Sequence, residues 1–322
     1  MNDIRWGIIG SGKIARRFAS DLKLVESAKL IGVAGRNYHN TQIFTQEFGG
    51  TAFSSIEELL HSNADVIYVA TPHTEHKEHS LVAIRKGKAV LCEKPFTMDI
   101  KEAREVLAEA KNRKVFVMEG MWTRFFPAIG EVIDLIRQGK IGKVLQIESS
   151  FGYQSQFDPA SRVFDPTLGG GSLLDVGVYS VAFAQMLMNE KASVKEAKAV
   201  MSLTGVDESL EWELAFSSDV KAKGQSSVVK ILRNEAIIKG DKGVISIPRF
   251  WCPNEYFLNG LKKEFHFEGR GFQFEAMEVM NCLRKGYLES ELVSHQYTLD
   301  VMETLDMIRE HIGLHYPSRS HT

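Results

Sequence analysis

Cysteine is scarce in this sequence, and that scarcity narrows the class of protein. The chain of 322 residues has only Cys92, Cys252 and Cys282, which lie far apart and follow no metal-ligand spacing. Such usage predicts neither a disulfide framework nor a zinc site. A reducing, cytoplasmic setting is therefore the default expectation.

An excess of charge and long apolar runs are also lacking. The 39 basic and 41 acidic residues give a net charge of −2, so nucleic acid is not an expected partner. We see no apolar run that approaches the about 20 residues needed to span a bilayer, which predicts no membrane partner. The opening stretch, MNDIRWGIIGSG, enters a strand at once and does not resemble a signal peptide.

Residues 1–122 alternate short apolar runs with amphipathic stretches, the pattern of a parallel sheet covered by helices on both faces. This α/β pattern is typical of a nucleotide-binding Rossmann domain. We expect strands at 4–9, 29–34, 51–53, 66–70, 89–92 and 115–118, and helices at 13–22, 41–48, 56–60, 76–86 and 100–111.

Residues 123–322 have a different character. A mostly alternating β pattern runs from 194 to 267, with a tight hairpin expected at Gly240-Asp241. This half predicts an α+β domain with a largely antiparallel sheet. We expect helices at 129–137, 172–187, 272–284 and 299–312, a strand at 143–153 and a glycine-rich loop at 158–171.

The turn after the first strand fits the dinucleotide fingerprint G-x-G-x-x-G/A, with Gly10, Gly12 and Ala15 at the marked positions. The spacing alone is weak evidence, but a strand precedes it and a helix follows, as the fingerprint requires. A generic strand–helix turn is the alternative. The residues expected to bind the cofactor here are Gly10, Ser11, Gly12, Lys13, Ile14 and Ala15.

The end of the second strand bears on the choice of cofactor. An acidic residue there would bind the adenosine ribose and favour NAD. This sequence has Gly35, Arg36 and Asn37 instead, and an arginine suits a 2′-phosphate. We therefore favour NADP(H), with NAD(H) possible; the alternative is a solvated loop arginine.

A charged pair ends the apolar run at 89–92. Glu93 and Lys94 follow it, and Pro95 prevents any further ladder hydrogen bond at that position. Ligands of open α/β sheets sit beyond the carboxyl ends of the strands, where Lys94 is expected. The pair therefore indicates a functional lysine, and the alternative is a strand that emerges into solvent.

Four stretches, GIIGSGKIA, VATPHTEH, VLCEKPF and GGGSLLDVGVY, occur in an order and at a spacing that resemble one family. This is the glucose–fructose oxidoreductase/inositol dehydrogenase/rhizopine-catabolism (Gfo/Idh/MocA) family. EGMWTRFFP and SRVFDPTLGGGSLLDVGVY resemble the branch of dimeric dihydrodiol dehydrogenase and NADP-dependent D-xylose dehydrogenase. The resemblance covers nearly the whole chain and implies a large open sheet in the second domain, which commonly mediates a homodimer.

The resemblance also implies catalytic roles. Lys94 would bind the substrate hydroxyl, and Tyr179 would donate or accept the proton, with Lys94 lowering the pKa of this phenol. Many relatives have histidine where Tyr179 stands, so the tyrosine is a departure that the branch shares. Asp175, four residues before Tyr179 on an expected helix, would bind a substrate hydroxyl or orient Lys94.

Further candidates rest on position. The histidines of HTEHKEH lack metal-binding spacing, and no metal is expected. His76 is expected near the nicotinamide, or alternatively as a cap or surface residue. The remaining cofactor candidates are Thr71, Pro72, His73 and Glu93, and the candidates for a substrate pocket are Trp122, Arg124, Phe126, Arg162 and Phe164, with core packing or plain loop roles as the alternatives.

The function expected from these residues is an NADP(H)-dependent oxidoreductase that acts on a small-molecule sugar, polyol or trans-diol. A non-catalytic dinucleotide sensor or co-regulator of the same fold is the alternative. That alternative predicts the loss of the lysine or of the acid/base residue, and Lys94, Asp175 and Tyr179 are all present.

Overall fold

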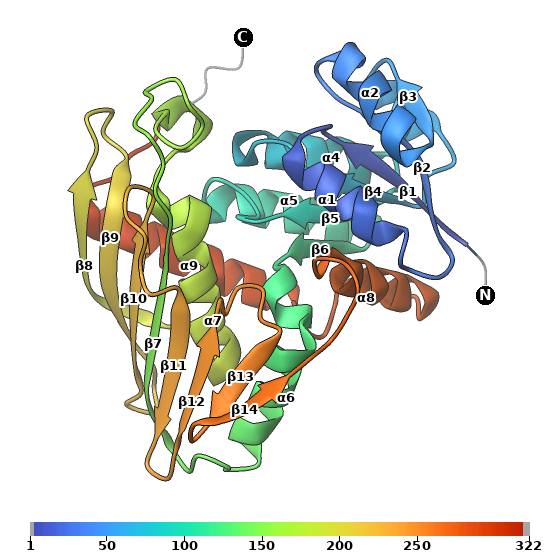
Figure 1. Ribbon diagram of the computed structural model, residues 1–322. Coiled ribbons are helices and arrows are strands. Elements are labelled where there is room, and N and C mark those ends of the chain that lie inside the picture. The colour runs from blue at the N-terminus through green and yellow to red at the C-terminus, as the bar shows by residue number, and fades with distance from the viewer. Residues whose placement is uncertain (1–2, 318–322) are drawn as a thin grey trace. The chain divides into compact units, whose positions relative to one another are not determined.

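The chain divides into two compact units, and the computed structural model describes residues 3–317 (Figure 1). The first unit comprises residues 1–122 and 267–298, and the second comprises 123–266 and 299–322. Residues 267–298, which the sequence pattern assigns to the second domain, thus pack with the first.

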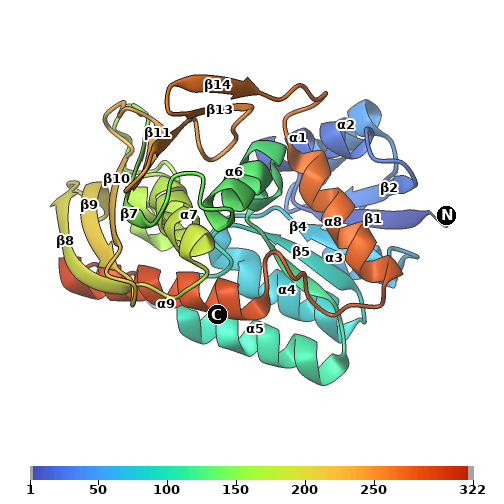
Figure 2. The same cartoon turned by 90° about the horizontal axis from the view of Figure 1, so that it is seen from below.

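The first unit contains a six-stranded parallel sheet of order β3-β2-β1-β4-β5-β6. Helices α1 and α8 pack together on one face, and α4 and α5 lie on the other (Figure 2). Its elements are β1 (Ile4–Ile9), α1 (Lys13–Leu22), β2 (Ala28–Ala34), α2 (Tyr38–Phe48), β3 (Thr51–Phe53), α3 (Ile56–His61), β4 (Val66–Val69), η1 (His73–Glu75), α4 (His76–Arg85), β5 (Ala89–Glu93), α5 (Ile100–Arg113), β6 (Val117–Gly120) and α8 (Phe272–Arg284).

The second unit is built on an eight-stranded sheet of order β14-β13-β12-β11-β7-β10-β9-β8. The β7–β10 pair is parallel, and the other pairs are antiparallel. Its elements are α6 (Pro127–Arg137), β7 (Val144–Gly152), η3 (Pro166–Leu168), η4 (Leu173–Gly177), α7 (Val178–Met188), β8 (Ser193–Met201), β9 (Asp207–Ala215), β10 (Lys221–Ser227), β11 (Glu235–Gly240), β12 (Val244–Pro248), β13 (Glu255–Leu258) and β14 (Leu261–Glu264); η2 (Trp122–Phe125) and α9 (His295–Ile312) cross the division.

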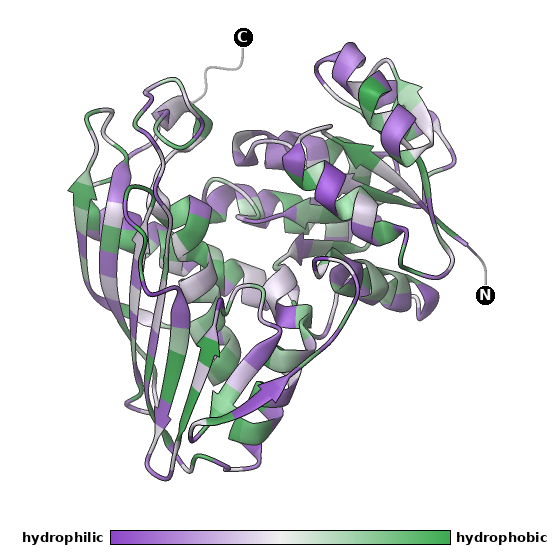
Figure 3. Ribbon diagram, viewed as in Figure 1, coloured by the Kyte–Doolittle hydropathy of each residue, from purple (hydrophilic) through white to green (hydrophobic). Residues whose placement is uncertain are grey.

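Burial along the second sheet follows the two-residue period of a sheet with one covered face. In β10 the side chains of Lys221, Lys223 and Gln225 are exposed, whereas the residues between them are buried. Helix α7 and the π-helical turn η4 pack on the covered face, against β7, β9 and β10. Hydrophobic and hydrophilic bands alternate along these strands (Figure 3).

One helical segment, Pro166–Met188, is long and apolar enough to cross a membrane by length and composition alone. It is longer than the helix expected at 172–187. However, 83% of its most apolar window is buried inside the protein, and the core helix of a folded domain passes the same test. This segment supplies the core of the second unit.

An aromatic cluster organises the core of the first unit. The Phe18 ring of α1 stacks on Tyr68 of β4 with centroids 3.8 Å apart, and it lies 5.3 Å from Trp6 and 6.4 Å from Phe272. Trp6, Phe18 and Tyr68 are all completely buried. The cluster therefore joins α1 and α8 to the sheet.

Replacing Phe18 with alanine is expected to lower the free energy of unfolding by about 3–5 kcal/mol, because a buried aromatic ring is lost and a cavity remains. Urea unfolding followed by tryptophan fluorescence measures this loss. Leu203→Ala is the control, since this side chain is 94% exposed, and its effect should stay within about 0.5 kcal/mol. Equal effects of the two substitutions would show that the cluster does not hold the first unit together.

Candidate active site

Several sequence-predicted residues gather at one edge of the first sheet. Strands β1, β4, β5 and β6 are parallel, so their carboxyl ends lie at the same edge. Gly10, Thr71 and Lys94 follow β1, β4 and β5 at that edge. The strand order reverses between β1 and β4, which is where open α/β sheets bind ligands.

The turn after β1 is shaped for a phosphate group. Gly10 has a φ of +107°, and a Cβ there would lie 2.6 Å from the carbonyl oxygen of Ala70. A Cβ at Gly12 would meet nothing within 4 Å, so the start of α1 is open. The first turn of α1 has no acidic residue, and no side chain caps it. Its N–H groups and helix dipole therefore favour an anion, while the buried Ala15 lets the helix pack closely.

The end of β2 contributes a cation to the same edge. Arg36 is exposed, and Gly35 lies beside the hydroxyls of Ser11 and Thr41. The Asn37 side chain caps α2 by accepting a hydrogen bond of 3.1 Å from the N–H of Asn40. Lys13 is exposed, whereas Ser11 and Ile14 are half-buried.

His76 connects two loops of this edge from inside the protein. Its Nδ1 lies 2.9 Å from the carbonyl oxygen of Pro95, and its Nε2 lies 2.9 Å from that of Thr71. Burial lowers the pKa of His76 to about 4, so the ring is neutral at neutral pH and donates only one of these hydrogen bonds. The structure thus gives His76 an internal bridging position between the loops after β4 and β5, and places the buried His73 beside it, with ring centroids 6.4 Å apart.

Glu93 faces inward and fixes the turn that carries Lys94. Its carboxylate accepts hydrogen bonds from the hydroxyl of Tyr68 and, at 3.2 Å, from the backbone N–H of Lys94. Burial raises the pKa of Glu93, and burial likewise raises the pKa of Tyr68. Lys94 itself is half-buried just beyond β5, where the sequence predicts it, and its peptide bond to Pro95 is cis.

In the second unit, Asp175 is the centre of a small polar group. Its Oδ2 accepts a hydrogen bond of 2.5 Å from the hydroxyl of Tyr153, and its Oδ1 forms an ion pair of 2.9 Å with Arg162. Burial raises the pKa of Tyr153, and the charge of Asp175 raises it further, so this phenol stays a hydrogen-bond donor. Sequence reasoning singles out Asp175 and Arg162 separately but misses Tyr153.

Tyr179 lies in the first turn of α7 and is 8% exposed. Its ring is 5.8 Å from Phe151, which in turn stacks on Trp251 at 3.6 Å. The residues before it form a π-helical turn, where the sequence predicts a regular helix. Such turns are frequent at functional sites, and this one changes the angular spacing between Asp175 and Tyr179.

Other expected pocket residues have different surroundings. Trp122 packs on Phe272 within the first unit, with centroids 4.4 Å apart. Phe164 is fully buried in a cluster with Val206 and Val228, and therefore lies in the core instead of a pocket wall. Phe126 is 1% exposed and also belongs to the core, while Arg124, Thr71 and Pro72 keep partial or full exposure.

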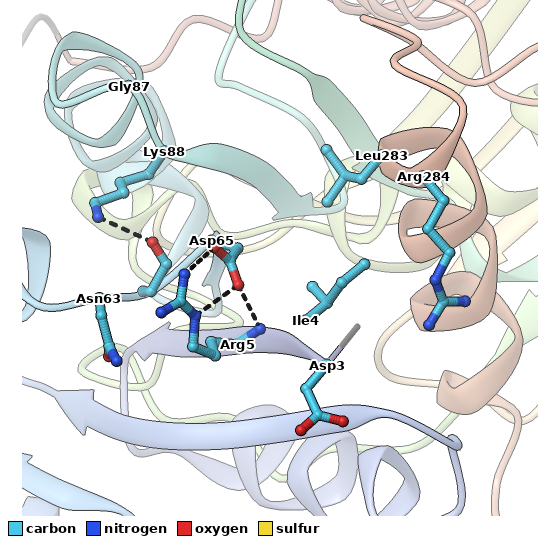
Figure 4. A pocket seen from close by; sticks show the side chains of 10 residues that line it. Asp3, Ile4, Arg5, Asn63, Asp65, Gly87, Lys88, Leu283 and Arg284 are labelled. Carbon is cyan, nitrogen blue, oxygen red and sulfur yellow. Dashed lines mark hydrogen bonds and ion pairs between the residues drawn. The ribbon is translucent and has the colours of Figure 1, made fainter. Parts of the chain in front are cut away.

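A hollow of about 930 Å³ opens at the opposite, amino-terminal edge of the first sheet (Figure 4). Arg5 there binds both oxygens of Asp65, at 2.9 and 2.6 Å. Lys88 donates to two backbone carbonyls at 2.9 Å. Both cations thus serve the fold, and we assign this hollow no ligand. Within residues 3–317, no group of three or more His, Cys, Asp or Glu side chains is arranged to hold a metal ion.

Asp207, at the start of β9, is a site-supporting residue that the sequence does not signal. It is completely buried, and its Oδ2 accepts hydrogen bonds from the N–H of Leu173 at 2.7 Å and the hydroxyl of Ser172 at 2.8 Å. It therefore holds the first residues of η4, the turn that carries Asp175. A Cβ at Gly171 would lie 2.2 Å from its Oδ1, so the approach requires glycine.

Asp207→Ala is expected to destabilise the protein by about 1–3 kcal/mol, because buried donors at the start of η4 lose their acceptor. Urea unfolding measures the loss. Asp134→Ala, at an exposed position of α6, is the control and should change little. An Asp207→Ala variant as stable as the control would contradict the assigned role.

Asp207 also predicts a pH dependence. Burial raises its pKa from 3.8 to about 6, so the folded state binds more protons than the unfolded state between those values. The contribution of this group to the free energy of unfolding therefore falls as pH rises through that window. Asp207→Asn keeps the acceptor oxygen but cannot titrate. The stability difference between wild type and Asp207→Asn should change across the window, and a constant difference would contradict the assignment.

Comparison with known proteins places this chain in a family. Residues 4–121 match the model of an oxidoreductase family with an NAD-binding Rossmann fold, and residues 129–246 match the GFO/IDH/MocA C-terminal domain. The trans-1,2-dihydrobenzene-1,2-diol dehydrogenase of Danio rerio is 35% identical over 98% of this chain and 99% of its own length. The human protein of that name is 33% identical over 98% of each chain.

Two solved structures share the fold. The aldose-aldose oxidoreductase of Caulobacter crescentus is 22% identical, with a TM-score of 0.88 over 96% of this chain and 97% of that one. The 3-ketoreductase KijD10 of Actinomadura kijaniata, in complex with NADP and TDP-benzene, is 24% identical, with a TM-score of 0.87 over 97% and 98%. With relatives this similar over their full length, and with both of its domains matched, the chain belongs to the Gfo/Idh/MocA family of oxidoreductases.

Proposed function

We propose that this protein is an NADP(H)-dependent oxidoreductase that interconverts a hydroxyl and a carbonyl group on a sugar, polyol or trans-diol. The observation that carries the proposal is the edge of the first sheet, where an open phosphate-binding turn and the Lys94 turn follow neighbouring strands. The relatives named as dihydrodiol dehydrogenases support a diol substrate, and the sugar oxidoreductase of similar fold supports the wider class.

The two units take different roles in this proposal. The first unit binds the dinucleotide through Gly10–Ala15, the end of β2 and the loops after β4 and β5. The second supplies substrate contacts through Asp175 and Arg162. NADP(H), when bound, supplies or accepts the hydride.

The protein's own groups manage the proton and the substrate oxygen. Tyr179 donates or accepts the proton, and Lys94 binds the reacting oxygen and stabilises negative charge on it. Asp175, already ion-paired with Arg162 and bound by Tyr153, offers a rigid acceptor for a second substrate hydroxyl. A phenol held by packing on an aromatic neighbour loses little entropy when it meets the substrate.

The proposal extends to a cytoplasmic homodimer. The three cysteines are free thiols, as a reducing compartment favours. The uncovered face of the second sheet carries Lys223 and Glu213, 3.3 Å apart, and Lys239 and Glu148, 2.7 Å apart. Such a face of mixed charge is suited to pairing with a second copy of itself, and sedimentation of the purified chain tests this.

The sensor alternative receives less support. A sensor needs a dinucleotide site but neither a proton donor nor an aligned lysine. Lys94 stands on a turn fixed by Glu93, and Tyr179 adjoins a π-helical turn, which are features that a purely binding role does not require. We therefore favour the enzyme.

Tyr179→Phe is expected to reduce kcat by about 100-fold or more, because general acid–base catalysis contributes factors of about 10²–10⁴. NADPH affinity, measured by fluorescence titration, should be retained. Tyr287→Phe, on a side chain that is 40% exposed, serves as the control. Turnover of Tyr179→Phe close to that of wild type would contradict the proposed role of Tyr179.

Arg36→Ala tests the cofactor preference. Loss of a charged hydrogen bond to a 2′-phosphate should raise the KM for NADP⁺ by about 10- to 100-fold and leave that for NAD⁺ unchanged. The assay follows NAD(P)H absorbance over a panel of aldoses, polyols and trans-diols, with exposed Arg137→Ala as the control. Wild-type activity with NAD⁺ alone would overturn the NADP(H) assignment, and tight NADPH binding without turnover on the whole panel would favour the sensor.

A further inference from the structure

Glu275 of α8 is a buried carboxyl group without a visible role in the fold. It is completely buried, and neither of its oxygens has a hydrogen-bond partner in the part of the chain that the structure describes. Leaving an ionised carboxylate buried and unpaired is very costly in free energy, so such a group either binds a proton or is paired with a donor. Glu275 therefore requires an explanation that packing alone does not give.

The position of Glu275 relates it to the turn that carries Lys94. A Cβ built on Gly120 would lie 3.4 Å from Oε2 of Glu275 and 3.5 Å from Cα of Glu93. Gly120 and Glu93 are direct partners across β6 and β5. The Glu275 carboxyl therefore lies beside Gly120, whose partner on the neighbouring strand is Glu93, and the glycine leaves the room that this carboxyl uses.

Aromatic side chains surround the two acids. Phe18 stacks on Tyr68, whose hydroxyl binds Glu93, and Phe18 also meets the edge of Phe272, three residues before Glu275. Burial raises the pKa of Glu275 well above its ordinary value, and the charges of Glu93 and Asp21 raise it further.

Other titratable groups face the same region. Asp21 of α1 accepts backbone hydrogen bonds from Arg270 and Phe272, at 2.8 and 3.0 Å, and is satisfied. Glu119 of β6 accepts a hydrogen bond of 3.0 Å from the hydroxyl of Thr298, and burial raises its pKa to about 7. Lys94 is the cation that acts on Glu93. The donors that reach Glu93 are thus Tyr68 and the Lys94 N–H, and its carboxylate has acceptor capacity left.

We propose that Glu275 is a positioning residue for the Lys94 turn: it holds a proton at neutral pH and shares it with Glu93. The pair then carries one negative charge instead of two next to Lys94. Two ionised carboxylates in this enclosure would repel each other and displace the turn that Glu93 fixes. The effect on catalysis rests on the proposed function, whereas the protonation of Glu275 does not.

Infrared spectroscopy tests the protonation directly. At neutral pH the wild type should show carboxylic-acid C=O absorption that shifts in D₂O. Glu275→Gln should remove one band of it, whereas the band of Glu119, whose pKa is about 7, should remain. Glu291→Gln, which replaces an exposed glutamate of the same unit, is the control and should keep the band. A spectrum in which Glu275→Gln removes no such band overturns the proposal, whether or not a substrate has been found.

Kinetics test the positioning role. Glu275→Gln keeps a neutral donor where the proposal places the proton, so its kcat should stay near that of wild type. It should also lose any fall in kcat that the wild type shows at alkaline pH, where the pair gives up its proton. Glu275→Leu fills the space without a donor, and its kcat should drop by about 10- to 100-fold as the turn shifts, with the KM for NADP⁺ little changed.

The outcomes separate the positioning role from packing and from the proposed function. If Glu275→Leu is folded, as judged by near-ultraviolet circular dichroism, and keeps wild-type kcat, the positioning role is wrong. If Glu275→Leu does not fold, Glu275→Gln still decides, because a large loss of kcat in that variant contradicts a neutral donor. Tight NADPH binding without wild-type turnover on the whole panel favours the sensor over the proposed function and removes the kinetic comparison, but the infrared result still decides the protonation of Glu275.

Discussion

The parallel register of β1, β4, β5 and β6 is the constraint on which the candidate site of the first unit depends. Because these strands run in one direction, the chain leaves each of them at the same edge of the sheet. Gly10, Thr71 and Lys94 reach that edge from positions far apart in the sequence. His76 joins the loops after β4 and β5 by contacting a backbone carbonyl of each. Glu93 accepts a hydrogen bond from the N–H of the next residue, Lys94.

Much of the first unit is predictable because its elements carry strong local signals. The expected bounds of β1, α1 and α8 agree with the structure, since apolar periodicity and the flanking glycines mark their ends. The strand predicted at 115–118 instead spans Val117–Gly120, and α9 begins at His295 instead of residue 299. Val115 and Phe116 are apolar and buried without belonging to the strand, so hydrophobicity alone misplaces its start. The residues missed at the start of α9, 295–298, are mostly polar and give no hydrophobic boundary.

The candidate site is predictable in part, for a physical reason. Fingerprints such as Gly10-x-Gly12 and Glu93-Lys94-Pro95 are local, because backbone shape and a single turn determine them. The contacts of Tyr153 with Asp175 and of Asp207 with Leu173 join residues 22 and 34 positions apart, and no sequence period encodes them. Likewise the start of the π-helical turn at Leu173–Gly177 is held by the distant Asp207, and Phe164 is core because of a cluster that forms only in the fold.

The return of residues 267–298 to the first unit has a consequence for synthesis. Helix α8 supplies Phe272 to the aromatic cluster and the backbone N–H groups that satisfy the buried Asp21. During translation, the sheet of the first unit emerges long before this helix does, with the whole of residues 123–266 made in between. The cofactor domain therefore completes its core after most of its neighbour has left the ribosome. Nascent chains hold an exposed apolar face on α1 for that interval, and the second sheet has time to form first.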